Sequence, residues 1–134
     1  MRIGIGAVGR MKTGPEKELA DRYLDRFGKA GASLGLDYAG LAEIVESRAA
    51  NVDERRRDEA DRLRAGFPAR SVLVVLDERG RALSSEHFAA RLADWRDAGQ
   101  KHCALLIGGP DGHDEALRAD AALLVSFGAM TWPH

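Results

Sequence analysis

The stretch SVLVVLD, residues 71–77, decides the fold of this 134-residue chain. It is apolar on both faces, which is typical of a strand in the middle of a parallel sheet that helices cover on both sides. The stretch CALLI, residues 103–107, has the same character. A segment with helical spacing lies between the two, where Phe88, Leu92 and Trp95 recur at i, i+4 and i+7. This order predicts an α/β sheet with crossover connections.

The rest of the chain alternates in the same way. We expect further strands at 2–8 and, with a strand-like start, at 36–45. We expect helices opening at Pro15, over 52–65, after a cap at Ser84 or Ser85, and near 114–122. Residues 77–83 are expected to form the turn between the 71–77 strand and the helix that follows. An apolar run, LLVSFGAMTWPH, closes the sequence.

Length and composition predict one domain, residues 1–134, of a protein that is 45% hydrophobic and 31% charged. No apolar run approaches the length of a membrane span, and the first residues lack the order of a secretion signal. The lone cysteine, Cys103, excludes an internal disulfide and fits a reducing cytoplasm. We expect a cytoplasmic protein in which Cys103 is a small core residue.

The formal net charge is −1, so it does not indicate a general attraction for nucleic acid. Basic residues cluster at Arg55, Arg56 and Arg57, but acidic residues flank the cluster on both sides. The pattern favours a solvated helix face over a phosphate clamp. No zinc-ligand spacing links the four histidines, which are His87, His102, His113 and His134. His102 and Cys103 are adjacent on a strand and so point to opposite faces, which argues against a nucleophile–base pair.

The loop LLIGGPDG, residues 105–112, follows the 103–107 strand, and ligands of α/β sheets sit at the carboxyl ends of strands. It is neither a P-loop nor a dinucleotide fingerprint. Gly108 and Gly109 allow positive φ and close approach to the backbone, so a structural turn and a ligand loop both stay open. We expect Asp111 to cap a turn, and the role of Asp77 stays open.

Four segments together carry a resemblance: MRIGIGAVGRMK at the start, VVLDERG, LLIGGPDG, and SFGAMTWPH at the end. In this order they resemble the RlmH family, ribosomal RNA methyltransferases of the SPOUT superfamily that act on a pseudouridine of large-subunit RNA. The pairing of IGGP-[ED]-G with T-x-P-H is the most specific part. The resemblance covers essentially the whole chain.

The resemblance implies a sheet whose C-terminal part is tied in a trefoil knot, with the knot loops forming a pocket for S-adenosyl-L-methionine. The residues it implies at the cofactor are Leu76, Gly108, Gly109, Gly128, Ala129, Met130, Thr131, Trp132 and Pro133. A side chain at Gly108 or Gly109 is expected to intrude on the cofactor space. The role of Trp132, stacking on a ligand or filling a dimer seam, stays open.

The resemblance also implies methyl transfer to N3 of the pseudouridine, a homodimer, ribosomal RNA in the assembled ribosome as partner, and no metal. It implies a further helix and tail after His134, which this sequence does not contain, so we expect part of the catalytic site to be missing and assign no catalytic residue. His134 is at most a supporting residue. Two other readings stay open: a nucleotide- or phosphate-binding α/β protein, and a non-catalytic dimeric module of the ribosome.

Overall fold

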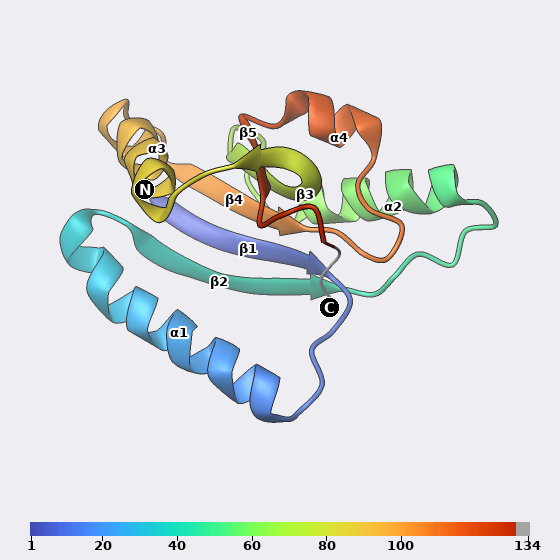
Figure 1. Cartoon of the computed structure of the whole chain (residues 1–134), viewed down its shortest axis with the longest axis horizontal. Coiled ribbons are helices and arrows are strands. Elements are labelled where there is room, and N and C mark those ends of the chain that lie inside the picture. The colour runs from blue at the N-terminus through green and yellow to red at the C-terminus, as the bar shows by residue number, and fades with distance from the viewer. Residues whose placement is uncertain (131–134) are drawn as a thin grey trace.

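The two apolar stretches lie side by side as the central strands of a parallel sheet in the computed structural model, which describes residues 1–130 (Figure 1). The strands are β1 (Arg2–Val8), β2 (Asp37–Ile44), β3 (Val72–Ala82), β4 (His102–Ile107) and β5 (Leu123–Ser126). Their order in the sheet is β2-β1-β4-β3-β5, and the ladders between neighbours are all parallel. The α/β class predicted from the sequence is confirmed.

Helices cover both faces of this sheet. They are α1 (Pro15–Gly31), α2 (Val52–Ala65), α3 (Ser85–Asp97) and α4 (Glu115–Asp120), with a 3-10 turn at Ala32–Leu34. Side chains of α1 and α3 pack on the face that carries Val74 and Cys103, whereas α2 and α4 pack on the face that carries Val75 and Leu106. No helix in the described part of the chain is long and apolar enough to cross a membrane.

Local sequence explains where the helices begin. The Asn51 side chain accepts a hydrogen bond from the backbone of Glu54 at 2.8 Å and caps α2. Ser84, one of the two caps predicted for α3, accepts from the backbone of His87 at 3.1 Å. Cys103 is 1% exposed, and its burial raises the pKa of the thiol to about 11, so the prediction of a core residue is confirmed.

The expected turn at 77–83 is wrong, because β3 continues to Ala82. Val125 of β5 pairs with Leu76 and also with Arg81. A strand has two hydrogen-bonding edges, and each edge pairs with one partner segment, so Leu76 and Arg81 lie on opposite edges of β5. The segment 77–80 therefore carries the chain across β5. The trefoil knot implied by the resemblance stays a prediction, since residues 131–134 lie outside the described part.

Gly80 permits this crossing. A Cβ atom at position 80 would lie 2.7 Å from the carbonyl carbon of Leu124 and 2.9 Å from that of Val125. Both atoms belong to the backbone of β5, which cannot move aside as a flexible side chain can. A glycine is therefore required at the closest approach of the two segments.

We predict that Gly80→Ala lowers the free energy of unfolding by about 1–3 kcal/mol, the usual range for forcing extra atoms into a packed site. Urea denaturation followed by circular dichroism measures the change. Gly28→Ala is the matched control: its Cβ would lie 3.9 Å from the nearest atom, in the interior of α1. The control is expected to keep or raise stability. Equal effects of the two substitutions would contradict the close approach at β5.

Candidate functional site

A cleft of about 730 Å³ opens beside the middle of β3, where β4 and β5 end. Three segments form its wall: 76–79 within β3, 107–113 at and after the end of β4, and the end of β5 with the residues that follow it. Arg56 of α2 reaches its edge. The volume lies within the range of small-molecule sites, and the carboxyl edge of a parallel sheet is where such sites occur. A smaller hollow between α1 and Tyr38 lies away from these strand ends.

The structure brings five of the predicted cofactor residues to this one cleft: Leu76, Gly108, Gly109, Gly128 and Met130. Ala129 belongs to the same segment but does not line the cleft. Thr131, Trp132 and Pro133, and also His134, lie outside the described residues. The bends at residues 108–112 and 126–130 thus share a cavity. Their binding of a cofactor stays a prediction.

Three large hydrophobic side chains of the wall are exposed. Ile107 is 36% exposed, and Phe127 and Met130 are each 73% exposed, although all three are large hydrophobic residues. Exposed apolar side chains that gather on one cavity mark a binding surface more often than solitary ones do. Together with the glycine backbone of 108–112, they offer a flat, apolar lining with amide and carbonyl groups at its edges.

Arg55 and Arg56 hold the glycine loop. The Nε atom of Arg55 donates to Oδ2 of Asp111 at 2.8 Å, and Nε of Arg56 donates to the Asp111 carbonyl oxygen at 2.7 Å. The hydrogen bond from Arg55 also holds the pKa of Asp111 below its usual range. The expected solvated face is therefore wrong for these two arginines. Asp111 does not act as a simple turn cap but as the partner of Arg55.

Side chains at Gly108 and Gly109, which we expected to intrude on the cofactor space, would instead meet other residues of the protein. A Cβ at Gly108 would lie 3.0 Å from Nε2 of His113, and one at Gly109 would lie 2.8 Å from Cγ1 of Val8. Added side chains would thus strike the protein itself. The glycines let the loop pack against these two residues, and the cleft gains its backbone wall as a consequence.

His113 joins the glycine loop, residues 108–112, to Leu76 of β3. Its ring is buried, and Nε2 lies 3.1 Å from the carbonyl oxygen of Leu76. Burial lowers the pKa of His113, which favours the neutral ring, and a neutral ring bonded to a carbonyl through Nε2 carries its proton on that atom. Sequence reasoning missed this role, because a lone histidine after a glycine loop has no distinguishing pattern.

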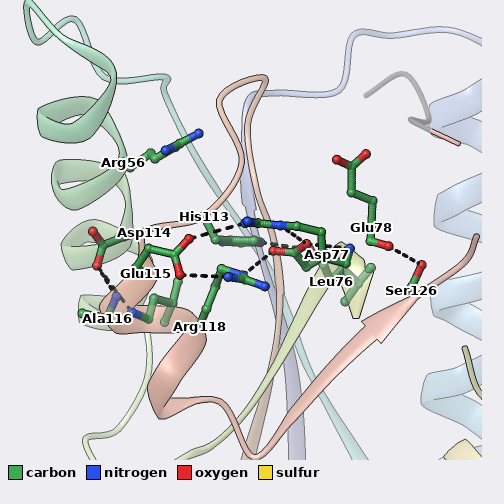
Figure 2. A network of polar contacts seen from close by, with 12 residues as sticks. Arg56, Leu76, Asp77, Glu78, His113, Asp114, Glu115, Ala116, Arg118 and Ser126 are labelled. Atoms are coloured by element: carbon green, nitrogen blue, oxygen red, sulfur yellow. Dashed lines mark hydrogen bonds and ion pairs between the residues drawn. The ribbon is translucent and has the colours of Figure 1, made fainter. Parts of the chain in front are cut away.

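Asp77 is the centre of a network of ion pairs at the cleft floor (Figure 2). Its side chain is 6% exposed, and Oδ2 accepts from Nε of Arg118 at 2.7 Å. Oδ1 accepts from the backbone of Arg79 at 2.8 Å. Burial alone raises the pKa of Asp77, but the Arg79 amide and the Arg118 guanidinium outweigh it and hold the pKa below its usual value. The role of Asp77, which the sequence left open, is therefore to fix β3 against α4.

Glu59 of α2 is a second buried carboxyl group, 3% exposed. One oxygen accepts from the backbone of Ser47 at 3.2 Å, and the other has no hydrogen-bond partner among the described residues. Burial raises the pKa of Glu59. Its position beside Gly109 places it behind the glycine loop. No sequence pattern indicates this residue, because it lies in a run of charges that favours a solvated helix.

Among residues 1–130, no three histidine, cysteine or acidic side chains lie close enough together to hold a metal ion.

The parallel sheet, the crossing of β5 and the glycine-walled cleft at the carboxyl edge identify an α/β protein with a cleft suited to a small molecule. The sequence comparison gives its family. Residues 1–134 match the family described as predicted SPOUT methyltransferase, and the chain belongs to that family. Within it, the chain belongs to the RlmH family, as its relatives show.

Three relatives carry the same name, ribosomal RNA large subunit methyltransferase H. Those of Mesorhizobium japonicum, Sinorhizobium medicae and Brucella anthropi are 54%, 56% and 52% identical to this chain. Each alignment covers 100% of the chain and 84% of the relative.

We predict that Asp77→Asn lowers the free energy of unfolding at neutral pH by about 1.5–3 kcal/mol, because it replaces the buried carboxylate that accepts from Nε of Arg118 with a neutral amide, while the ion pair of Arg118 with Glu115 at 2.9 Å remains. The pKa of Asp77 is lowered from 3.8 on folding, so its carboxylate stabilises the protein above that pH and stops doing so as the pH falls further. The difference between wild type and variant should shrink below about pH 3.8. Urea titrations across pH measure it.

Asp25→Asn is the control, since Asp25 pairs with Lys29 on the exposed face of α1, where its side chain is 61% exposed. Its effect should stay below about 1 kcal/mol. A loss in Asp77→Asn no greater than in this control would contradict the role of Asp77.

Proposed function

We propose that the protein transfers the methyl group of S-adenosyl-L-methionine to N3 of a pseudouridine in large-subunit (23S) ribosomal RNA. The observation that carries the proposal is the single cleft shared by two side-chain-poor bends, 108–112 and 126–130. The relatives' name supports ribosomal RNA as the acceptor. We further propose that the protein acts in the cytoplasm as a homodimer, on RNA within the assembled ribosome.

The cleft fits this methyl donor by its shape and chemistry. Adenine is flat and apolar on its faces, and Ile107, Phe127 and Met130 supply an exposed apolar lining of that kind. The loop at Gly108 and Gly109 would supply backbone groups for the polar edges of the ring. Leu76, Gly128 and the following residues complete the proposed binding set, to which Ala129, Thr131, Trp132 and Pro133 also belong.

The donor supplies a methyl group on a positively charged sulfur, which needs no further activation. The task of the protein is then to place the acceptor nitrogen in line with that carbon and to exclude water. N3 must also lose its proton, which a base or a site that stabilises the anion assists. In the described cleft, Asp77 is already bonded to Arg118 and Arg79, so we assign it to holding the wall rather than to taking this proton.

A direct test uses ribosomes purified from a strain that lacks the modification. The protein is incubated with them and with donor labelled in its methyl group, and the RNA is digested and analysed by mass spectrometry. We expect label on one large-subunit pseudouridine. Heat-inactivated protein and fully modified ribosomes are the controls.

Transfer to another base, or none from a folded protein that binds the donor, would contradict the proposed reaction. Calorimetric binding of a nucleoside phosphate in place of the methyl donor would favour the phosphate-binding reading.

A further inference from the structure

Arg56 occupies the mouth of the cleft rather than its floor. It lies in the first half of α2, and its side chain is 35% exposed, so it faces both the cavity and solvent. Figure 2 shows its side chain extending from α2 toward the space above His113 and Asp77.

The guanidinium is held in position by one hydrogen bond. Its Nε atom donates to the carbonyl oxygen of Asp111 at 2.7 Å, which uses one of the five N–H groups that an arginine carries. The terminal Nη groups point away from this bond. Fixing the planar group beforehand reduces the entropy lost when it binds an anion through these remaining donors.

Of the two arginines that line the cleft, Arg56 has the less neutralised charge. Arg55 pairs with Asp111 at 2.8 Å, and Arg118 pairs with Asp77 at 2.7 Å. Arg79, the other arginine that lines the cleft, lies 3.4 Å from Asp77 and 3.6 Å from Glu115. The one ion pair of Arg56 within the described residues is with Asp53 at 3.8 Å, whose side chain is 83% exposed. A pair this long and this exposed contributes little.

We propose that Arg56 binds a backbone phosphate of the RNA while the target base lies in the cleft. This inference rests on the proposed function for its substrate class. A chain with a net charge of −1 has no general attraction for RNA, so its phosphate contacts must be made by individual groups such as this one. The Nη groups of Arg56 make no hydrogen bond within the described residues, and only the long contact to Asp53 at 3.8 Å competes for them, so they can match a phosphate through paired hydrogen bonds. The donor's own carboxylate is a second possible anion, which the experiment distinguishes.

The test measures binding of the protein to purified ribosomes at fixed Mg²⁺ and at several KCl concentrations between about 50 and 200 mM. Arg56→Ala should weaken binding about fivefold to twentyfold at the lower salt, as expected for loss of a charged hydrogen bond. It should also reduce the slope of log affinity against log salt by about 0.7–0.9. Arg56→Lys, which keeps the charge, should retain most of the slope.

Arg57→Ala is the matched control, because it removes the same charge from the neighbouring, exposed position of α2 and does not line the cleft. It should leave the slope unchanged. Arg55→Ala separates loop damage from phosphate binding: it breaks the contact to the Asp111 side chain but leaves the Nη groups of Arg56 in place. It should alter the slope less than Arg56→Ala does.

Calorimetry with the methyl donor completes the experiment. Arg56→Ala removes one hydrogen bond to the glycine loop, so it should weaken donor binding no more than Arg55→Ala, which breaks the other contact to Asp111. A greater loss, equal to the ribosome effect, would assign Arg56 to the donor carboxylate and overturn the inference. A slope unchanged in Arg56→Ala, or reduced equally in Arg57→Ala, would also overturn it. Because binding needs no catalysis, a protein that binds ribosomes through Arg56 but transfers no methyl group contradicts only the proposed reaction.

Discussion

The pairing of β5 with two parts of β3, one before and one after Gly80, is the constraint on which the rest of the structure depends. Val125 contacts Leu76 on one edge and Arg81 on the other, and Gly80 provides the room for the crossing. This arrangement brings the residues after β5 next to residues 76–79 of β3 and the end of β4. Without it, the bend at 126–130 would not face the glycine loop, and the cleft would have a single wall.

Charged side chains stabilise the walls that the strands bring together. Arg118 of α4 binds Asp77 of β3, while Arg55 and Arg56 of α2 bind Asp111 in the glycine loop. Each of these contacts joins a helix to a segment that lines the cleft. The packing of α2 and α4 on the sheet therefore also holds the walls of the cleft in place. Paired charges hold its polar floor, and apolar side chains remain exposed along its rim. The same wall can therefore be rigid and still receive a flat ligand.

The sequence predicted what depends on local pattern. Runs that are apolar on both faces identified β3 and β4, and caps such as Ser84 identified helix starts. The resemblance then supplied the cleft residues of both bends. Neither source indicated the pair of Asp77 with Arg118, which are 41 positions apart, or that of Arg55 with Asp111, which are 56 apart. A long-range ion pair leaves no periodic signal, and the extension of β3 beyond Asp77 depends on β5, which local propensity does not see.

The central claim is that the two bends form one site for a methyl donor, and a crystal structure with S-adenosylhomocysteine, the demethylated product, tests it most directly. The account predicts the adenine between the 108–112 loop and the segment after β5, against Leu76 and Ile107. Density for the ligand elsewhere on the sheet, or crystals in which these bends enclose no ligand at saturating concentration, would contradict it.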